Sequence, residues 1–189
     1  ISKEQRDYML RRQMKAIQEE LSTLSARFEE NLLDTTNAFA LFVENESELA
    51  GINMLFGASA TGARCMTSSS GPGFTLLSEG LTALAAAQLP AVVVCVSRAG
   101  PGLGRIASSQ ADYRLATRGG GHGDYRCLVF GPASAQELFE LTCRAFELAD
   151  RYRNPVIVLS DAILGQMMEP VDTAAVPPQD APEKDWAVR

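Results

Sequence analysis

Two stretches, AVVVCVS at residues 91–97 and PVIVLSD at residues 155–161, decide the fold of this chain. Each is a short run rich in valine and isoleucine and bounded by turn residues, which is typical of a strand buried on both faces of a parallel sheet. Two neighbouring runs, AFALFV at 38–43 and RCMTSS at 64–69, predict further strands, and a short apolar run, CLVFGP, lies at 127–132.

Helical patterns separate these runs, from Glu48 to about Thr61, from about Phe74 to Ala87 and from Ser134 to Tyr152. Strands that alternate with helices of this length are joined by crossover connections, which are right-handed and leave helices on both faces of a parallel sheet. The sequence therefore predicts a doubly wound α/β domain with a mainly parallel sheet from about residue 38 to residue 161.

A long amphipathic helix is predicted before this domain. Ser2 and Gln5 form a capping box, and apolar residues then recur at heptad spacing at Leu10, Met14, Ile17, Leu21 and Leu24. We expect this seam to pack against the chain's own domain or a partner. The other end of the chain is acidic and rich in proline, as linkers are. The predicted organisation is an N-terminal helix at 1–25, an α/β domain at 26–168 and a linker at 169–189.

Composition and charge exclude several classes of protein. The chain has 17 Lys and Arg against 23 Asp and Glu, a net charge of −6, which argues against nucleic acid as a partner. No apolar run is long enough to cross a membrane, and no secretory signal is present, so we expect a cytoplasmic protein. The 4 cysteines form neither a CxxC pair nor a zinc pattern, and we expect them to be reduced core residues.

Candidate ligand-binding loops follow the predicted strands, because ligands collect at the carboxyl ends of a parallel sheet. Residues 44–48, 68–73 and 98–105 follow the first three strands, and a glycine-rich loop lies at 118–124. We expect all four to converge on one cleft. None fits a phosphate-binding motif, and glycines between elements are more often turn residues. An isolated histidine such as His122 is more often structural, and a glutamate at a helix start such as Glu48 is most often a charge that suits the helix dipole. The residues alone therefore indicate an α/β domain with a ligand cleft.

Longer matches point to a family. They are ESELAGINMLFGASATGARCMTSSSGPG at 46–73, RAGPGLG at 98–104, SSQADYRLATRGGGHGDYR at 108–126, YRNPVIVLSDAILGQMMEPV at 152–171 and PEKDW at 182–186. Together they resemble the alpha subunit of thiamine-diphosphate-dependent 2-oxoacid:ferredoxin oxidoreductases, and within that family the branched-chain, 2-ketoisovalerate type. The likeness extends from about Phe42 to Trp186 in consistent order.

The resemblance implies an enzyme that oxidatively decarboxylates a 2-oxoacid, joins the acyl group to coenzyme A and passes electrons to ferredoxin. This chain resembles the pyrimidine-binding domain, which shares thiamine diphosphate with a partner subunit. A beta subunit and cluster-carrying gamma or delta subunits are the implied partners, and magnesium and the iron–sulfur clusters are expected only in them. We therefore expect the chain to be inactive without partner subunits.

The family pattern assigns roles to residues by position. Glu48 matches the glutamate that bonds the pyrimidine N1′ of the cofactor and favours its imino tautomer, which makes it the expected catalytic residue. Arg98 matches the arginine that binds the substrate carboxylate, and Ala99 follows it where the family usually has glycine. Ser69, Ser70 and Gly71, in the SSSGPG turn, are expected to border the cofactor. No metal ligand is assigned to this chain.

Two features depart from the family pattern. The family's first strand and its YPITP-type turn, whose threonine contacts the substrate, have no counterpart. In their place ISKEQRDYMLRRQMKAIQEEL at 1–21 resembles a helix of Lon proteases, although no Walker A motif follows, so Lon activity is not implied. The chain also stops where the family continues into another domain. We expect a fragment or a chimera joined near residues 21–26. The alternative function is a non-catalytic α/β assembly module whose N-terminal helix oligomerises.

Overall fold

The computed structural model describes residues 43–177 and 181–188. The predicted N-terminal helix with its heptad seam, the join near residues 21–26 and the strand AFALFV up to residue 42 lie outside the described residues. The chain divides into two units, and the unit that begins at Asn45 forms the α/β domain described below. Among the described residues, no helix has the length and apolar character needed to cross a membrane.

Parallel strands form the sheet, in the order β1 (Met66–Ser69), β2 (Ala91–Ala99), β5 (Pro155–Asp161) and β4 (Leu128–Phe130). The two stretches that decide the fold lie side by side at its centre, with Val92 opposite Val156 and Val93 opposite Ile157. Valine and isoleucine suit this position because their branched side chains pack well on a sheet buried on both faces. The predicted parallel sheet is confirmed, and the run CLVFGP contributes its outer strand β4.

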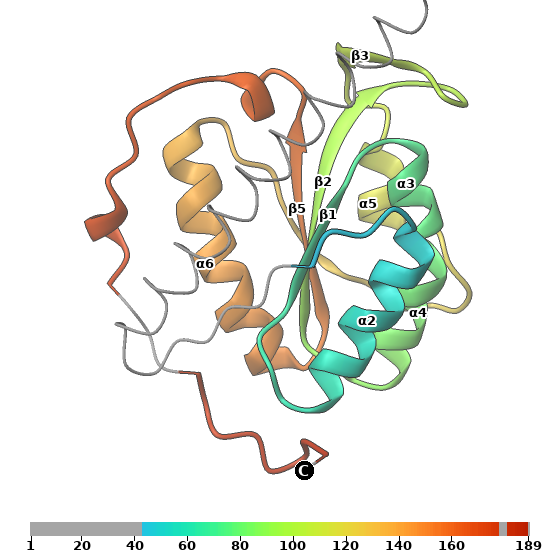
Figure 1. Ribbon diagram of the computed structural model, residues 1–189, viewed down its shortest axis with the longest axis vertical. Coiled ribbons are helices and arrows are strands. Elements are labelled where there is room, and N and C mark those ends of the chain that lie inside the picture. Colours follow the sequence, from blue (N-terminus) through green and yellow to red (C-terminus); the bar gives the residue numbers. More distant parts are fainter. Residues whose placement is uncertain (1–42, 178–180, 189) are drawn as a thin grey trace, which may run out of the picture. The chain divides into compact units, whose positions relative to one another are not determined.

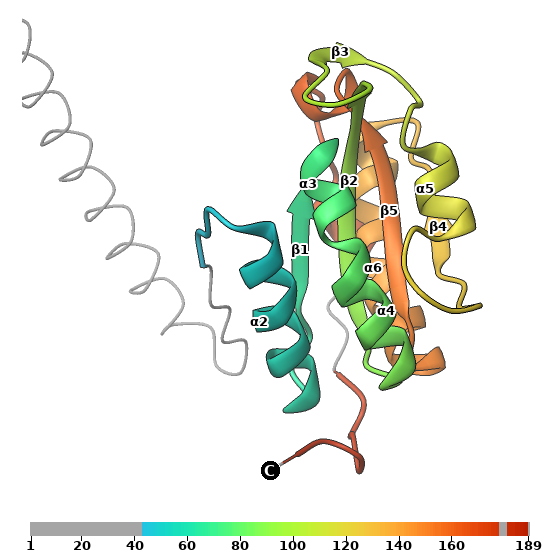
Figure 2. The same ribbon diagram turned by 90° about the vertical axis from the view of Figure 1, so that its right-hand side faces the viewer.

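Helices cover both faces of the sheet, as expected for a doubly wound domain (Figures 1 and 2). One face carries α2 (Glu48–Ala60), α3 (Pro72–Leu76), α4 (Ser78–Ala86) and α5 (Tyr113–Arg118), and the other carries α6 (Ala135–Tyr152). Hydroxyl caps begin the two longest of them: Ser47 Oγ accepts from Ala50 N–H at 3.3 Å, and Ser134 Oγ accepts from Glu137 N–H at 3.1 Å. The helix predicted from Glu48 is confirmed.

The core lies in two layers because successive side chains of a strand point to opposite faces. On one face, Val93 and Cys95 of β2 pack with Ile157 of β5 against α2, α3 and α4. On the other face, Val92 packs with residues of β5 and α6, namely Val156, Val158, Ala145 and Ala149. The small alanines allow α6 to lie close to the sheet.

Three details differ from the expectations. The helix expected from about Phe74 to Ala87 is two helices that meet at Leu77, a fully buried residue that ends α3 and begins α4. The region that begins with the loop expected at 98–105 contains a strand that the sequence did not predict, β3 (Arg105–Ser108), which folds back antiparallel to β2. Of the cysteines, all of them free thiols, only Cys95 is fully buried, and the other three are half-buried.

Two described parts of the C-terminal segment contact α6. Near the start of α6, Ala135 N–H donates to Glu169 Oε2 at 3.0 Å, and Asp172 N–H donates to Gln136 Oε1 at 2.7 Å. Two 3-10 turns, η1 (Leu164–Gln166) and η2 (Thr173–Ala175), interrupt the segment. Towards the end of α6, Lys184 Nζ lies 2.7 Å from Asp150 Oδ1.

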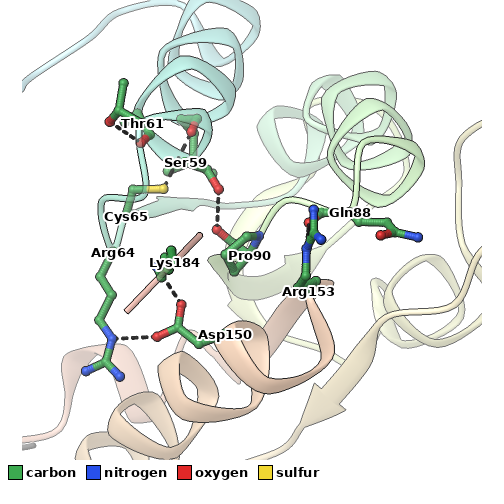
Figure 3. A network of polar contacts seen from close by, with 11 residues as sticks. Ser59, Thr61, Arg64, Cys65, Gln88, Pro90, Asp150, Arg153 and Lys184 are labelled. Carbon is green, nitrogen blue, oxygen red and sulfur yellow. Dashed lines mark hydrogen bonds and ion pairs between the residues drawn. The ribbon is translucent and has the colours of Figure 1, made fainter. Parts of the chain in front are cut away.

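That ion pair belongs to a polar cluster at the amino end of the sheet (Figure 3). Asp150 also accepts from Arg64 Nε at 2.7 Å, and the side chains of Asp150 and Lys184 are only 3% and 6% exposed. Arg153 stacks on the Trp186 ring at 4.7 Å and donates to the Gln88 carbonyl at 3.1 Å. The cluster therefore joins the ends of α2, α4 and α6 to residues 184–186, at the end of the domain opposite the carboxyl ends of the strands.

Candidate functional site

Loops that follow β1 and β2 meet the start of α2 at the carboxyl end of the sheet. The strand arrows point to this end in Figure 2, where β3 and the start of α3 also lie. Glu48 is the first residue of α2 and is half-buried, whereas its neighbours Ser47 and Leu49 are exposed. The cap of Ser47 fixes the start of the helix, so the backbone position of Glu48 is fixed as well.

Glu48 meets the turn that follows β1. Ser69 Oγ donates to Glu48 Oε1 at 3.5 Å, a long hydrogen bond between two half-buried side chains. Gly73, in the first turn of α3, leaves room for this pair, because a Cβ on Gly73 would lie 2.2 Å from Ser69 Oγ and 2.4 Å from Glu48 Oε1. The carboxylate can therefore lie over the turn only because residue 73 has no side chain.

Arg98 lies on the other side of the same turn. A Cβ on Gly71 would be 2.9 Å from Arg98 Nε and 3.2 Å from Nη2, so that edge of the guanidinium lies directly over the turn. Gly71 also has a φ of 53°, which favours glycine. Arg98 Nη1 donates to the carbonyl of Leu103 in the hairpin between β2 and β3. The turn at 69–73 thus separates a carboxylate from a guanidinium.

Asp112, which the sequence analysis did not single out, ties the far end of this hairpin to β2. Its N–H donates to Ser97 Oγ at 3.3 Å, and its Oδ2 accepts from Arg98 N–H at 3.4 Å. Although Asp112 is the N-cap of α5, its side chain makes no cap bond there. The local sequence SSQADY predicts only an ordinary helix cap at Asp112. The observed contact could not be predicted from it, because the partner, Arg98, lies in β2, 14 residues earlier.

The expected convergence of four loops is only partly seen. Residues from the first three come together as described, and Ser70 contributes its carbonyl, which accepts from Gly73 N–H at 3.1 Å. The fourth loop packs elsewhere: Gly121 lies against Ser78 and Thr82 of α4, and His122 is exposed. The tight packing of Gly121 on α4 gives this glycine a structural role.

A buried thiol lies beneath the site but suits no chemistry there. Burial raises the pKa of Cys95 to about 12, and the nearby Asp112 carboxylate adds to the shift. The side chain is therefore a neutral thiol at physiological pH, and a neutral thiol is a poor nucleophile. Within the described residues, no group of three or more His, Cys, Asp or Glu side chains is arranged to hold a metal ion.

The sequence matches a protein family over almost all of its length. Residues 4–185 match the family described as pyruvate flavodoxin/ferredoxin oxidoreductase, thiamine diphosphate-binding. The chain belongs to this family. The resemblance inferred from the sequence is therefore confirmed, and so is the α/β fold class.

Individual relatives agree with this assignment. The chain is 56% identical over 147 residues to ketoisovalerate oxidoreductase subunit VorB of Methanothermobacter thermautotrophicus. The aligned residues cover 78% of this chain and 42% of VorB. It is 46% identical over 139 residues to 2-oxoglutarate synthase subunit KorA of Archaeoglobus fulgidus, with 73% of this chain and 39% of KorA covered. The chain thus spans about two fifths of the length of these curated relatives.

A solved structure shares the fold. The 2-oxoglutarate:ferredoxin oxidoreductase from Magnetococcus marinus, with 2-oxoglutarate, coenzyme A and succinyl-CoA bound, is 40% identical and matches with a TM-score of 0.62. The match covers 65% of this chain and 21% of that chain.

Proposed function

We propose that this chain supplies the pyrimidine-binding half of a thiamine diphosphate site in a 2-oxoacid:ferredoxin oxidoreductase. The observation that supports it most directly is the meeting of Glu48 with Ser69 over Gly73 at the carboxyl end of a parallel sheet, in a domain of the thiamine diphosphate-binding family. When bound, this cofactor supplies a carbon centre that attacks the carbonyl of the substrate and takes up the electrons released on decarboxylation.

The residues of the site fit the cofactor's chemistry. A half-buried carboxylate at a helix start is a strong acceptor for a ring N–H, and the Glu48 carboxylate has only one long hydrogen bond, to Ser69, among the described residues. Gly71 and Gly73 keep the turn free of side chains, so the Glu48 carboxylate and the Arg98 guanidinium can lie against its backbone. In this proposal Glu48 shares a proton with the pyrimidine N1′, and Ser69, Ser70 and Gly71 border the ring.

Arg98 is the proposed anchor of the substrate carboxylate. Its Nε and Nη2 form a fork that matches the two oxygens of a carboxylate, and this edge lies over the turn at Gly71. The similarity to VorB, named for ketoisovalerate, favours a branched-chain 2-oxoacid over 2-oxoglutarate. Coenzyme A, ferredoxin, magnesium and iron–sulfur clusters are assigned in this proposal to partner subunits, a beta subunit and cluster-carrying gamma or delta subunits.

The test uses a complex reconstituted with partner subunits, in which the segment before residue 38 is exchanged for the corresponding segment of a full-length alpha subunit. Glu48→Gln keeps the volume of the side chain but cannot share a proton with the ring. We expect exchange of the cofactor's C2 proton and 2-oxoacid-dependent ferredoxin reduction to fall on the order of 10² to 10⁴-fold.

Glu46→Gln is the matched control, because Glu46 is exposed and two residues earlier in the same loop. It should leave both rates nearly unchanged. Unchanged C2-proton exchange in Glu48→Gln, or a larger effect of Glu46→Gln, would refute the assignment of Glu48.

A further inference from the structure

The segment between β2 and α5, residues 100–112, contains the hairpin between β2 and β3 and is closely tied to the site although the hairpin is exposed. Leu103 at the tip of the hairpin and Ile106 in β3 are 84% and 80% exposed, so burial of apolar side chains contributes little to holding it. Its base is instead fixed by strand pairing, with Ala99 opposite Arg105 and Arg98 opposite Ser108.

This hairpin holds one side of the Arg98 guanidinium. The Leu103 carbonyl accepts from Nη1, while the Nε and Nη2 edge lies over Gly71. A free arginine side chain loses rotamer entropy when it is fixed. Because the Leu103 carbonyl fixes the guanidinium in advance, the fork over the turn is already oriented before an anion arrives.

Gly104 decides where the Leu103 carbonyl points. Its φ is +59°, and a Cβ on it would lie 1.8 Å from the backbone oxygen of Ala99 and 2.8 Å from its carbonyl carbon. These are backbone atoms of the paired strand and cannot rotate away as a side chain would. Any side chain at residue 104 therefore forces the hairpin to open between β2 and β3, which withdraws the Leu103 carbonyl from Arg98.

We propose that Gly104 is a positioning residue for Arg98: by closing the hairpin on Ala99 it holds the Leu103 carbonyl against the guanidinium, and so keeps the guanidinium in place over the turn for an anionic group. That this group is the carboxylate of a 2-oxoacid rests on the proposed function. The positioning itself concerns only residues of this chain.

The first test measures the mobility of the Arg98 side chain in the isolated full chain, by NMR relaxation of its Nε–H group. The group is ordered in the unaltered protein and becomes mobile in Gly104→Ala. Gly102→Ala is the matched control, because Gly102 also has a positive φ, of 69°, but a Cβ there meets nothing within 4 Å. Gly102→Ala should leave Arg98 ordered.

Asparagine variants separate backbone strain from the clash with Ala99. Asparagine tolerates a positive φ but carries a Cβ, so Gly104→Asn should free Arg98 as Gly104→Ala does, whereas Gly102→Asn should not. A shortened hairpin, with residues 101–104 replaced by two glycines, removes the Leu103 carbonyl without any clash and should free Arg98 as well. An Nε–H group that stays ordered in these residue-104 variants and in the shortened hairpin would overturn the proposal.

The second test uses steady-state kinetics of the reconstituted complex. Gly104→Ala should raise KM for the 2-oxoacid about 10-fold, as expected for loss of a well-placed charged hydrogen bond. In an Arg98→Ala background, Gly104→Ala should cause no further increase of KM, because the side chain that Gly104 positions is absent. An equal increase of KM in both backgrounds would overturn the proposal. If Arg98→Ala alone leaves KM unchanged, the substrate role in the proposed function fails, and the NMR comparison still decides the positioning.

Discussion

Gly73→Ala is expected to impair the proposed cofactor site while leaving the domain folded. Gly73 lies in the first turn of α3, where its backbone is helical and alanine is accepted without strain. The new Cβ would lie 2.4 Å from Glu48 Oε1, whereas carbon and oxygen atoms that are not hydrogen-bonded normally stay at roughly 3.3 Å. The carboxylate must therefore move by about 1 Å, and Ser69 Oγ must rotate away.

Both affected atoms are at the ends of flexible side chains, so the cost to folding is small. Alanine stabilises a helix by about 0.5–1 kcal/mol relative to glycine, and the displaced side chains cost a similar amount in rotamer strain. The free energy of unfolding should change by less than about 1 kcal/mol, which shifts Tm by at most about 4 °C. A catalytic group misplaced by about 1 Å typically costs on the order of 10² in rate.

The assay compares thermal unfolding of the chain with C2-proton exchange in the reconstituted complex. Gly57→Ala is the matched control, because Gly57 is also helical and a Cβ there meets nothing within 4 Å. It should leave exchange unaltered and stabilise the fold slightly. Exchange at the unaltered rate in Gly73→Ala would refute the argument that Glu48 acts from its position over residue 73.

Other expected outcomes concern stability and binding. Asp150→Ala should lower the free energy of unfolding by about 3 kcal/mol, because it leaves the buried Lys184 ammonium without its carboxylate partner. Adding Lys184→Met should recover much of this loss. Urea unfolding that shows no recovery in the double variant would contradict the prediction. Stability should fall as pH rises above about 9, because the thiols ionise in the unfolded chain before they ionise in the folded domain. In the folded domain, burial raises the pKa of Cys65 and of Cys127 to about 11, and that of Cys95 to about 12. Urea unfolding from pH 8 to 11 measures this fall, and a flat profile would argue against it. The isolated chain should not bind thiamine diphosphate appreciably, since only half of the proposed site belongs to it, and tight magnesium-dependent binding in calorimetry would overturn this.

Much of the candidate site follows from the order of the strands. Because the carboxyl ends of parallel strands meet at one edge, the position of Glu48 after one strand, of Ser69 after the next and of Arg98 after the third predicts that they lie together. The structure brings them to one turn. The same rule fails for the loop at 118–124, because that loop follows a helix and packs on α4.

The sequence by itself determined the parallel sheet, its central strands and the helices on both faces, because these depend on the local period of apolar residues and on the handedness of crossovers. Only the tertiary structure decided the break at Leu77, the strand β3, the contact of Asp112 with β2 and the pairing of Lys184 with Asp150. The last three of these join residues that are distant in the sequence, and no local pattern specifies the partner. β3 pairs with β2 over only a few residues, and Lys184 meets Asp150 of α6, a helix that lies before β5 in the sequence. Such contacts form where packing has already placed the two groups side by side, so their physical origin lies in the folded domain and not in either segment alone.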